Sequence, residues 1–551
     1  MYVRLHRQSQ RGKIYTSVQI CESYRDPAKG NAPRCRVLLN LGPLDKVGPD
    51  TLRSLAKGFA RVAGVPDIEE EGVGRLLYAH DFGHVHAVGS VWDRLGLSEA
   101  LVHAGVDGGA TFSSAEMIRL LVVNRICEPR SKLALLDWLD GVHYGSGEKP
   151  SYHHLLRAMD RLIESKEKAE PLIAKRLLSP GEPVDLVFYD ITSTYFEGDR
   201  SLTGDDIRRY GYSRDGRFDK RQVVIGMVVT PDGIPLCHHV FPGNTVDKTT
   251  VVEVVKDLKT RFVLKRVVFV GDRGMLSDPN LNELLEEEVG FIVAHPLRHN
   301  HHAREVVGSL WRRFDRGSEQ EQFLEDRREK IRFVVAYSPE VAKANKAGRE
   351  KRLKRADGWI EEQLMKLRFP GTRGRRPTVR GTYDRIRDYL RDRNLLGFYD
   401  VTMSRDTVEV RKDRAALLWE SKIDGMLMVE TTDDTLTPEE VIGRYKELAE
   451  IERGWRALKS TLLIRPVYHW TERRIRAHIF VCALALQVER WMRRKLQGHA
   501  ASVPKAIESL QRIKAGEIEV GGKKTRVVSQ SSPEQRALLR SLEAAPMPDS
   551  F

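Results

Sequence analysis

Residues 183–296 alternate between short apolar segments and one-sided helical segments, and this alternation restricts the fold more than any other feature of the chain. DLVFYDITSTYF, KRQVVIGMVVT and IPLCHHVFPG are rich in β-branched and aromatic residues, and a PDG turn separates the last two, which predicts a strand followed by a hairpin. The sequence then predicts a helix in TTVVEVVKDLKTRF, a strand in RVVFVGD, a helix beginning at Asp278 and a strand in GFIVAHP. This order predicts a mixed α/β sheet.

Changes in pattern divide the rest of the chain. KIYTSVQICESY and RCRVLLNLG predict short strands, whereas segments such as SSAEMIRLLVVNRI, which begins with serines, predict helices from about 50 to 180. We expect a small β-rich segment, a helical domain, an α/β core made of two stretches, an insertion between those stretches and a C-terminal tail. Their predicted bounds are 1–48, 49–182, 183–300 with 421–495, 301–420 and 496–551. The helical domain could bind DNA, although ordinary helix packing explains its pattern equally well.

The chain carries a surplus of positive charge, and most of it lies in the predicted insertion. Lys and Arg outnumber Asp and Glu by 91 to 77, which gives +14, and residues 343–393 hold 17 basic and 7 acidic residues. Such a surplus suggests a polyanionic partner, because bound cations release counterions from phosphates. Gly and Pro preclude a continuous helix in RFPGTRGRRPTVRGTY. The stretch is either a solvated insertion or a basic arm on DNA, whose candidate contacts are Arg373, Arg375, Arg376 and Arg380.

Cysteine usage and hydropathy exclude several other classes of protein. The five cysteines are scattered and form no C-x-x-C pair, so the sequence predicts neither a disulfide framework nor a zinc ribbon. We expect reduced thiols and a cytoplasmic location. The basic N-terminus has no apolar region typical of a signal peptide, and no apolar run is long enough to predict a membrane span.

Two aspartates stand where carboxylates are unusual. Asp190 lies inside the apolar segment VFYDITSTYF, and Asp272 ends VVFVGDRGM between two glycines. Burying a carboxylate is costly unless it binds a metal or another cation, and ligands gather at the carboxyl ends of strands in open α/β sheets. The alternative for either residue taken singly is that it caps the following turn.

A third acid, Glu452, lies in the most clearly predicted helix of the chain, residues 437–460. Thr437, Pro438 and Glu440 form the capping-box pattern that typically begins a helix. At 3.6 residues per turn, one face carries Tyr445, Leu448, Glu452, Arg456 and Lys459. Such a face could present an acid to a metal and cations to a phosphate. A surface Glu–Arg pair four residues apart is the commoner explanation of a single acid in a helix.

Taken together, these residues resemble the DDE transposases of bacterial insertion sequences, and specifically the insertion sequence 4 group with its Y-x2-R-x3-E-x6-K signature. Tyr445, Glu452 and Lys459 fall on that spacing, whereas Leu448 replaces the signature arginine. Further similar motifs are D-x-T-S at Asp190, FPGNTVD at 241–247, GDRGM around Asp272 and RPVYHWTERRIRAHIFVCALAL after the acidic helix. The resemblance extends over about 185–490.

The resemblance implies an RNase H-like core whose catalytic acids are Asp190, Asp272 and Glu452. Asp190 and Asp272 are 82 residues apart, and Glu452 follows 180 residues later, so an insertion must precede the acidic helix. The family implies that this insertion is a largely β element that contacts the transposon end. Three carboxylates suit two Mg²⁺ ions, for which Mn²⁺ can substitute. We expect Asp190 to bridge the ions.

The predicted function is therefore cut-and-paste DNA transposition. Tyr445, Arg456 and Lys459 would contact phosphates near the cut. The expected partners are double-stranded DNA, as terminal repeats and as target, and a second copy of the chain in the synaptic complex; the enzyme would lie in the bacterial cytoplasm, on the nucleoid when bound. Two alternatives remain: an RNase H-like nuclease without strand transfer, and a non-catalytic DNA-binding derivative, which should have lost one of the acids.

Overall fold

The structure is a computed structural model that describes most of the chain. The described residues are 1–10, 13–26, 30, 32–64, 75–109, 111–145, 150–178, 186–197, 206–246, 250–262, 268–271, 278–287, 289–298, 300–329, 331–371, 376–520 and 523–548. The chain divides into two compact units. The first comprises Met1–Ala79, Ala515–Ser529 and Pro548–Phe551, and the second comprises His80–Lys514 and Gln530–Met547.

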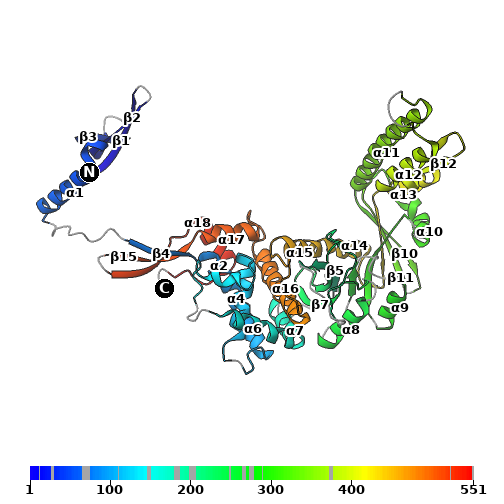
Figure 1. Ribbon diagram of the computed structural model, residues 1–551, viewed down its shortest axis with the longest axis horizontal. Helices are drawn as coiled ribbons and strands as arrows, with labels where there is room; N and C mark the ends of the chain where they lie inside the picture. Colours follow the sequence, from blue (N-terminus) through cyan, green and yellow to red (C-terminus); the bar gives the residue numbers. More distant parts are fainter. Residues whose placement is uncertain are drawn as a thin grey trace. The chain divides into compact units, whose positions relative to one another are not determined.

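The first unit contains two small sheets. One has the order β1-β2-β3, and helix α1 (Leu44–Val62) follows it (Figure 1). Its strands are β1 (Tyr2–Gln10), β2 (Lys13–Asp26) and β3 (Ala32–Pro43). The sequence predicted β2 and β3 but not β1, whose residues become a strand by pairing with β2 along their whole length. The second sheet has the order β16-β15-β4. Its strands are β4 (Arg75–Asp81), β15 (Lys514–Val520) and β16 (Lys523–Val528).

The second unit begins with helices, as the sequence predicted. They are α2 (Gly83–Arg94), α3 (Leu97–His103), α4 (Ser114–Cys127), α5 (Ala134–Leu139), α6 (Tyr152–Glu164) and α7 (Lys166–Leu177). Ser113 caps α4 by accepting a hydrogen bond from the backbone N–H of Glu116, which is the predicted serine cap. Helix α16 (Glu472–Lys495) packs against α4 and α6.

Helix α16 is buried on every side from Ala477 to Met492, which explains why IFVCALAL shows no polar face. Within the described residues, no helix combines the length and apolarity that crossing a bilayer requires. Two further helices, α17 (Val503–Gln511) and α18 (Pro533–Ser541), lie in the predicted C-terminal tail. That segment is therefore folded, because α17 packs against α2, α18 packs against α17, and β15 and β16 join β4 in one sheet.

A mixed eight-stranded sheet forms the centre of the second unit and confirms the predicted α/β class. Its order is β10-β11-β14-β9-β8-β5-β6-β7. The strands predicted first are β5 (Leu186–Tyr195), β6 (Gln222–Val229), β7 (Pro235–Pro242), β8 (Val268–Gly271) and β9 (Gly290–His295). Strand β6 is antiparallel to β5, and β7 is antiparallel to β6, whereas β8 and β9 run parallel to β5. Helices α8 (Val251–Arg261) and α9 (Asp278–Glu286) contribute Val254 and Leu284 to the core cluster on one face.

The predicted insertion departs from expectation in two ways. First, β10 (Gln322–Arg328) and β11 (Ile331–Tyr337) extend the central sheet beyond β14 (Met426–Thr431), which lies in the stretch 421–495 predicted for the core. Second, the part between β11 and β14 is mainly helical, so the largely β element that the resemblance implied is wrong for the described residues. Its elements are α11 (Pro339–Arg368), α12 (Val379–Asp392), β12 (Tyr399–Met403), β13 (Val408–Lys412) and α13 (Arg414–Ile423). They share a core of their own around Ile360, Ile386 and Leu390.

Candidate active site

Asp190 introduces a carboxylate into an apolar strand. Along β5, Val187, Tyr189 and Ile191 belong to the core cluster beside α8 and α9, so Asp190 points to the opposite face, because successive strand residues alternate. Its Oδ1 accepts a hydrogen bond from the backbone N–H of Ile191 at 2.7 Å, and its Oδ2 accepts one from the indole N–H of Trp455 at 2.9 Å. Both oxygens are thus fixed before any ligand binds.

The environment of Asp190 opposes its negative charge. Burial, with a smaller contribution from the charge of Glu452, raises the pKa of this carboxyl to about 6, against the opposing effect of the two hydrogen bonds and the cation Arg214. Glu452 therefore lies close enough to act on Asp190 electrostatically. The raised pKa of Asp190 shows that Arg214 does not fully offset the negative charge here, and two neighbouring carboxylates offer oxygen ligands that fit a hard divalent cation.

Glu452 and Trp455 both lie on α15 (Leu448–Ser460), which a single residue, Glu447, separates from α14 (Pro438–Lys446). The single helix predicted for 437–460 is therefore wrong. The backbone tightens at Glu447, whose N–H bonds to the carbonyls of both Gly443 and Arg444 and whose carbonyl accepts from Glu450. Glu452 keeps its side chain exposed, while Trp455 is buried against β5.

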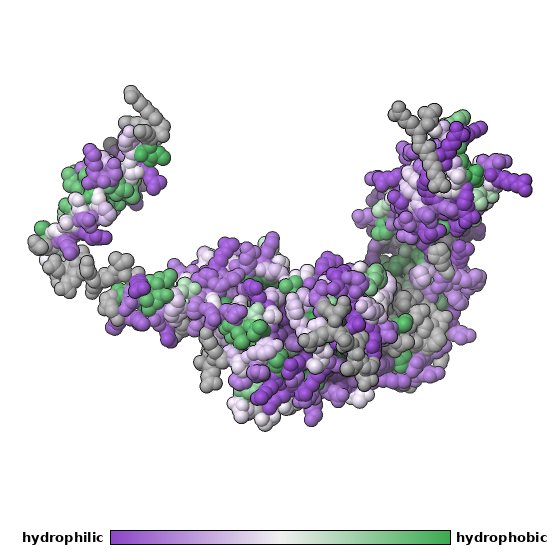
Figure 2. Space-filling model, in the orientation of Figure 1, coloured by the Kyte–Doolittle hydropathy of each residue, from purple (hydrophilic) through white to green (hydrophobic). Residues whose placement is uncertain are grey.

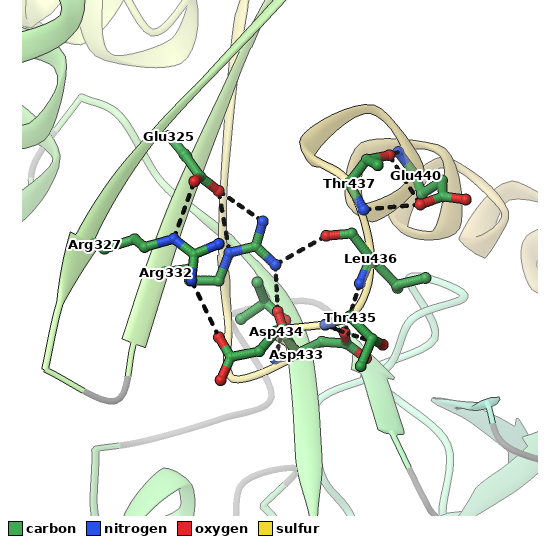
Figure 3. Close-up of polar contacts among 10 residues, drawn as sticks. Glu325, Arg327, Arg332, Asp433, Asp434, Thr435, Leu436, Thr437 and Glu440 are labelled. Carbon is green, nitrogen blue, oxygen red and sulfur yellow. Dashed lines mark hydrogen bonds and ion pairs between the residues drawn. The ribbon is translucent and has the colours of Figure 1, made fainter.

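A polar turn sets the point at which α14 begins (Figure 3). Asp433 Oδ1 accepts hydrogen bonds from the backbone N–H groups of Thr435 and Leu436 at 2.8 and 2.9 Å. Thr437 then caps the helix, and its N–H donates to Glu440 while its side chain accepts from the N–H of Glu440, which confirms the predicted capping box.

Arg332 of β11 holds this turn from the neighbouring strand (Figure 3). Its guanidinium donates to the carbonyls of Asp433 and Leu436, the latter at 3.0 Å. Glu325 of β10 accepts from the same guanidinium at 2.6 and 3.1 Å. These contacts fix the start of α14, the helix that precedes α15 and Glu452, to the two strands at the edge of the central sheet.

Asp272, the third predicted acid, lies outside the described residues. The strand that leads to it is described: β8 ends at Gly271 and pairs in parallel with β5, with Phe188 opposite Val270. The role of Asp272 as a metal ligand therefore stays a prediction.

Two comparisons with protein families agree with this arrangement. The family model described as Transposase DDE domain matches residues 187–488, more than half of the chain. The chain belongs to the DDE transposases. A second family model, the N-terminal domain of IS1634 family transposases, matches residues 4–69. A search of curated proteins finds no significant match.

Membership confirms several of the sequence predictions. The transposase has an RNase H-like α/β core, and it is a metal-dependent enzyme that cleaves DNA and transfers strands. Its class as an insertion-sequence transposase is also confirmed. The insertion sequence 4 group is not confirmed, because the N-terminal match is to the IS1634 family, which is a different one.

Lys459 of the transposase is engaged by an acid that sequence reasoning missed. Its Nζ donates to Asp215 Oδ1 at 2.9 Å, and Arg465 forms an ion pair with the other oxygen of the same carboxylate. Burial by itself raises the pKa of Asp215, but the hydrogen bonds from Lys459 and Arg465 outweigh it and hold the pKa below its usual range. Two cations share one acid here, so the group keeps a surplus of positive charge beside α15.

The other predicted DNA contacts lie on different elements. Tyr445 is half-buried on α14, and Arg456 is exposed on α15, on the helix of Glu452. The predicted contacts of the insertion are not part of this group, because Arg376 lies three residues before the start of α12 and Arg380 lies within it. Arg380 pairs with Asp384 at 3.1 Å. Arg373 and Arg375 lie outside the described residues. Hydrophilic side chains cover most of the surface around α11 and α12 (Figure 2).

Trp455, Asp215 and Arg465 carry weak signals in the sequence. Trp455 stands three residues after Glu452, so helical periodicity could have placed it on a neighbouring part of the same face. Its bond to Asp190 joins residues 265 positions apart, and the bond from Lys459 to Asp215 joins residues 244 apart. Nothing in the spacing of a single sequence indicates such pairs.

Proposed function

We propose that this transposase binds the ends of its own element as double-stranded DNA, cuts them with two Mg²⁺ ions and joins them to target DNA. The ions would be held by Asp190, Asp272 and Glu452, with Asp190 shared between them. The observation that carries this proposal is the state of Asp190: a carboxylate fixed by two hydrogen bonds, with its pKa raised by burial and by Glu452. A site built in this way favours binding of cations.

The residues of the chain position the reacting groups. When bound, the ions would lower the pKa of the attacking water or 3′-hydroxyl and stabilise charge on the leaving oxygen. Trp455 keeps the carboxylate of Asp190 in one orientation, and the turn clamped by Arg332 sets where the helices that carry Glu452 begin. Lys459, Arg456 and Tyr445 would contact phosphates next to the cut, where positive charge neutralises the strand.

Joining two ends requires both to be held at once, so we propose a homodimer in the synaptic complex. An RNase H-like nuclease would use the same acids but would leave free 3′-hydroxyl ends. The products distinguish these possibilities, since only a transposase links the cleaved end to a second duplex.

The test uses the full chain and a duplex that contains the DNA bordering its own gene, with a supercoiled target plasmid. Wild type in Mg²⁺ should give cleaved ends and joined products; EDTA should abolish both, and Ca²⁺ should permit binding while stalling chemistry. Asp190→Ala, Asp272→Ala and Glu452→Ala should each abolish cleavage while leaving DNA binding largely intact. Glu450→Ala is the matched control on α15, because Glu450 is occupied by Arg453 and Arg493.

Near-wild-type cleavage by one of the three variants would remove that residue from the site. Robust cutting in EDTA would end the metal assignment. Cleavage without joined products would establish a nuclease instead of a transposase.

A further inference from the structure

A cavity of about 470 Å³ lies between the end of α4, the start of α6, the segment that joins α15 to α16, and α16 itself. The lining includes four cations, Arg125, Arg130, Lys132 and Arg465, together with two histidines, and no carboxylate belongs to it among the described residues. Arg130 and Arg465 have acidic partners elsewhere, Glu128 and Asp215 respectively. The two deepest cations, Arg125 and Lys132, therefore decide what the cavity can accept.

Lys132 is a buried ammonium group that contacts a histidine. It is 5% exposed, and its Nζ lies 2.6 Å from Nδ1 of His478. Nε2 of His478 lies 2.9 Å from the carbonyl of Ile464, to which it donates. Nδ1 of a neutral imidazole is then the acceptor, so one N–H of Lys132 is satisfied by a neutral group.

Arg125 is the second cation in the cavity and is 6% exposed. It makes long hydrogen bonds of 3.2 to 3.5 Å to the carbonyls of Leu462, Leu463 and Arg130, and its Nε has no partner among the described residues. Burial, together with the positive charge of Arg125, lowers the pKa of Lys132 to about 7, and Cys482 opposes this. Burying charge without a counterion is costly, and an entering anion would remove that cost.

The cavity adjoins the candidate active site through one side chain. Arg465 lines the cavity and shares the carboxylate of Asp215 with Lys459, on the helix that carries Glu452. Glu452 and Lys459 are seven residues apart, which is about 10 Å along the helix axis. That distance corresponds to roughly three nucleotides of one DNA strand. A strand that passes Glu452 and Lys459 would next reach this opening.

We propose that this cavity binds a backbone phosphate of the element's end, a few nucleotides from the cut, through Lys132 and Arg125, with His478 holding Lys132 in place. The inference rests on the proposed function, since it assumes that DNA is bound across α15. The ligand is a phosphate group, and its two possible sources are the DNA backbone and free phosphate. The experiment separates them.

The first arm replaces single phosphates of the bound duplex by neutral methylphosphonates, one position at a time, and measures affinity in Ca²⁺. With wild type, one position should weaken binding about tenfold, as expected for one charged contact. Lys132→Met should bind the unmodified duplex more weakly by about the same factor and become insensitive to that position. Its plot of log affinity against log salt should flatten by roughly one unit. Lys168→Met, which removes an exposed lysine of α7, should keep the full sensitivity.

The second arm compares the melting of wild type and Lys132→Met in chloride and in inorganic phosphate at equal ionic strength, without DNA. A cavity that accepts phosphate predicts a higher melting temperature for wild type in phosphate and an unchanged one for the variant. Lys132→Gln is the second variant in case Lys132→Met does not fold, because glutamine keeps an N–H donor for His478 without the charge.

The outcomes decide the proposal. A position-specific weakening that disappears in the Lys132 variants supports it, whereas equal sensitivity of wild type and variants at every position overturns it. Stabilisation by phosphate without any position-specific effect also overturns it and assigns the cavity to a free anion. If wild type does not bind the duplex at all, the proposed function fails, and that result is distinct from binding that ignores Lys132.

Discussion

At the scale of single residues, the indole of Trp455 links the two described acids, because it donates to Asp190 from the helix that carries Glu452. Trp455→Phe keeps the ring and removes the donor. Groups that orient a metal ligand are typically worth about 10- to 100-fold in affinity or rate, so we expect cleavage in limiting Mg²⁺ to fall by that factor. Trp138→Phe is the control, since its indole N–H has no hydrogen-bond partner in the described chain. Equal rates for both variants would show that Trp455 does not orient Asp190.

His84 provides a prediction about pH. It is fully buried on α2, neither ring nitrogen has a hydrogen-bond partner among the described residues, and burial lowers its pKa to about 4. The folded state therefore requires neutral imidazole, so stability is complete above the unfolded pKa near 6.5 and is lost as pH falls toward 4. Between pH 7 and pH 5 this group should lower the free energy of unfolding by about 2 kcal/mol.

Thermal melting at both pH values checks this. His84→Leu should melt higher than wild type at pH 5 and show a smaller difference between the two conditions, whereas the exposed His153→Leu should behave as wild type. An unchanged pH dependence in His84→Leu would assign the acid sensitivity to other buried groups.

The acids themselves were accessible to sequence reasoning, because a carboxylate within an apolar strand is conspicuous. Asp190 was predicted from this logic and Glu452 from the face of its helix, both together with the family spacing, and the charge of Glu452 contributes to the raised pKa of Asp190. Asp215 was not predicted, because it enters the site only through its ion pairs with Lys459 and Arg465, which are distant in the sequence. Contacts of this kind follow from tertiary packing and leave no local pattern.

At the scale of elements, the clamp on the turn before α14 yields the next prediction. Arg332 is 3% exposed and binds Glu325 and two backbone carbonyls, so Arg332→Met leaves both carbonyls without this donor and leaves Glu325 with Arg327 alone. We expect the unfolding free energy to fall by about 3–5 kcal/mol, as for a broken buried ion pair. Arg327→Met is the matched control on β10, since Arg327 binds the same Glu325 but is half-exposed and should cost at most about 1 kcal/mol. Denaturant unfolding followed by tryptophan fluorescence measures both, and equal effects would contradict the clamp.

Helix starts were more predictable than helix continuity. The capping box at Thr437 and the serine cap of α4 are local patterns, and both are present. The break at Glu447 was missed, because no Gly or Pro marks it and the tightened turn involves only backbone hydrogen bonds. The strands β10 and β11 were assigned to the insertion for a related reason. Their place in the central sheet depends on pairing with β14, about 90 residues later in the chain.

At the scale of the whole molecule, the charge distribution was predicted better than the architecture that carries it. The surplus of positive charge between 343 and 393 was visible in the sequence, and the structure places most of it on α11 and α12. The long helix α11 has many exposed Lys and Arg residues, whereas its buried positions, such as Leu353 and Ile360, pack into the insertion's own core. An insertion with an independent core can present this charge as a folded surface, which a solvated loop cannot.

The last prediction tests whether that surface grips DNA. Neutralising Arg373, Arg375, Arg376 and Arg380 together should flatten the plot of log affinity against log salt by roughly one unit for each phosphate that the protein no longer neutralises. Binding should weaken alike for all DNA sequences, because phosphate contacts position the protein without reading bases. Cleavage at saturating DNA should survive, since Asp190 and Glu452 lie on other elements.

Arg380 pairs with Asp384, so we expect it to neutralise DNA phosphates less than Arg376, the other described arginine of the set. Arg376→Gln should therefore change the slope more than Arg380→Gln. The control set removes the same formal charge from exposed positions elsewhere, namely Lys505, Arg512, Lys523 and Lys524. If both sets change the slope equally, net charge and not the insertion drives the effect. If the insertion variants leave slope and affinity untouched, the DNA-binding surface must lie on other elements, and the helical region before residue 180 would be the next candidate.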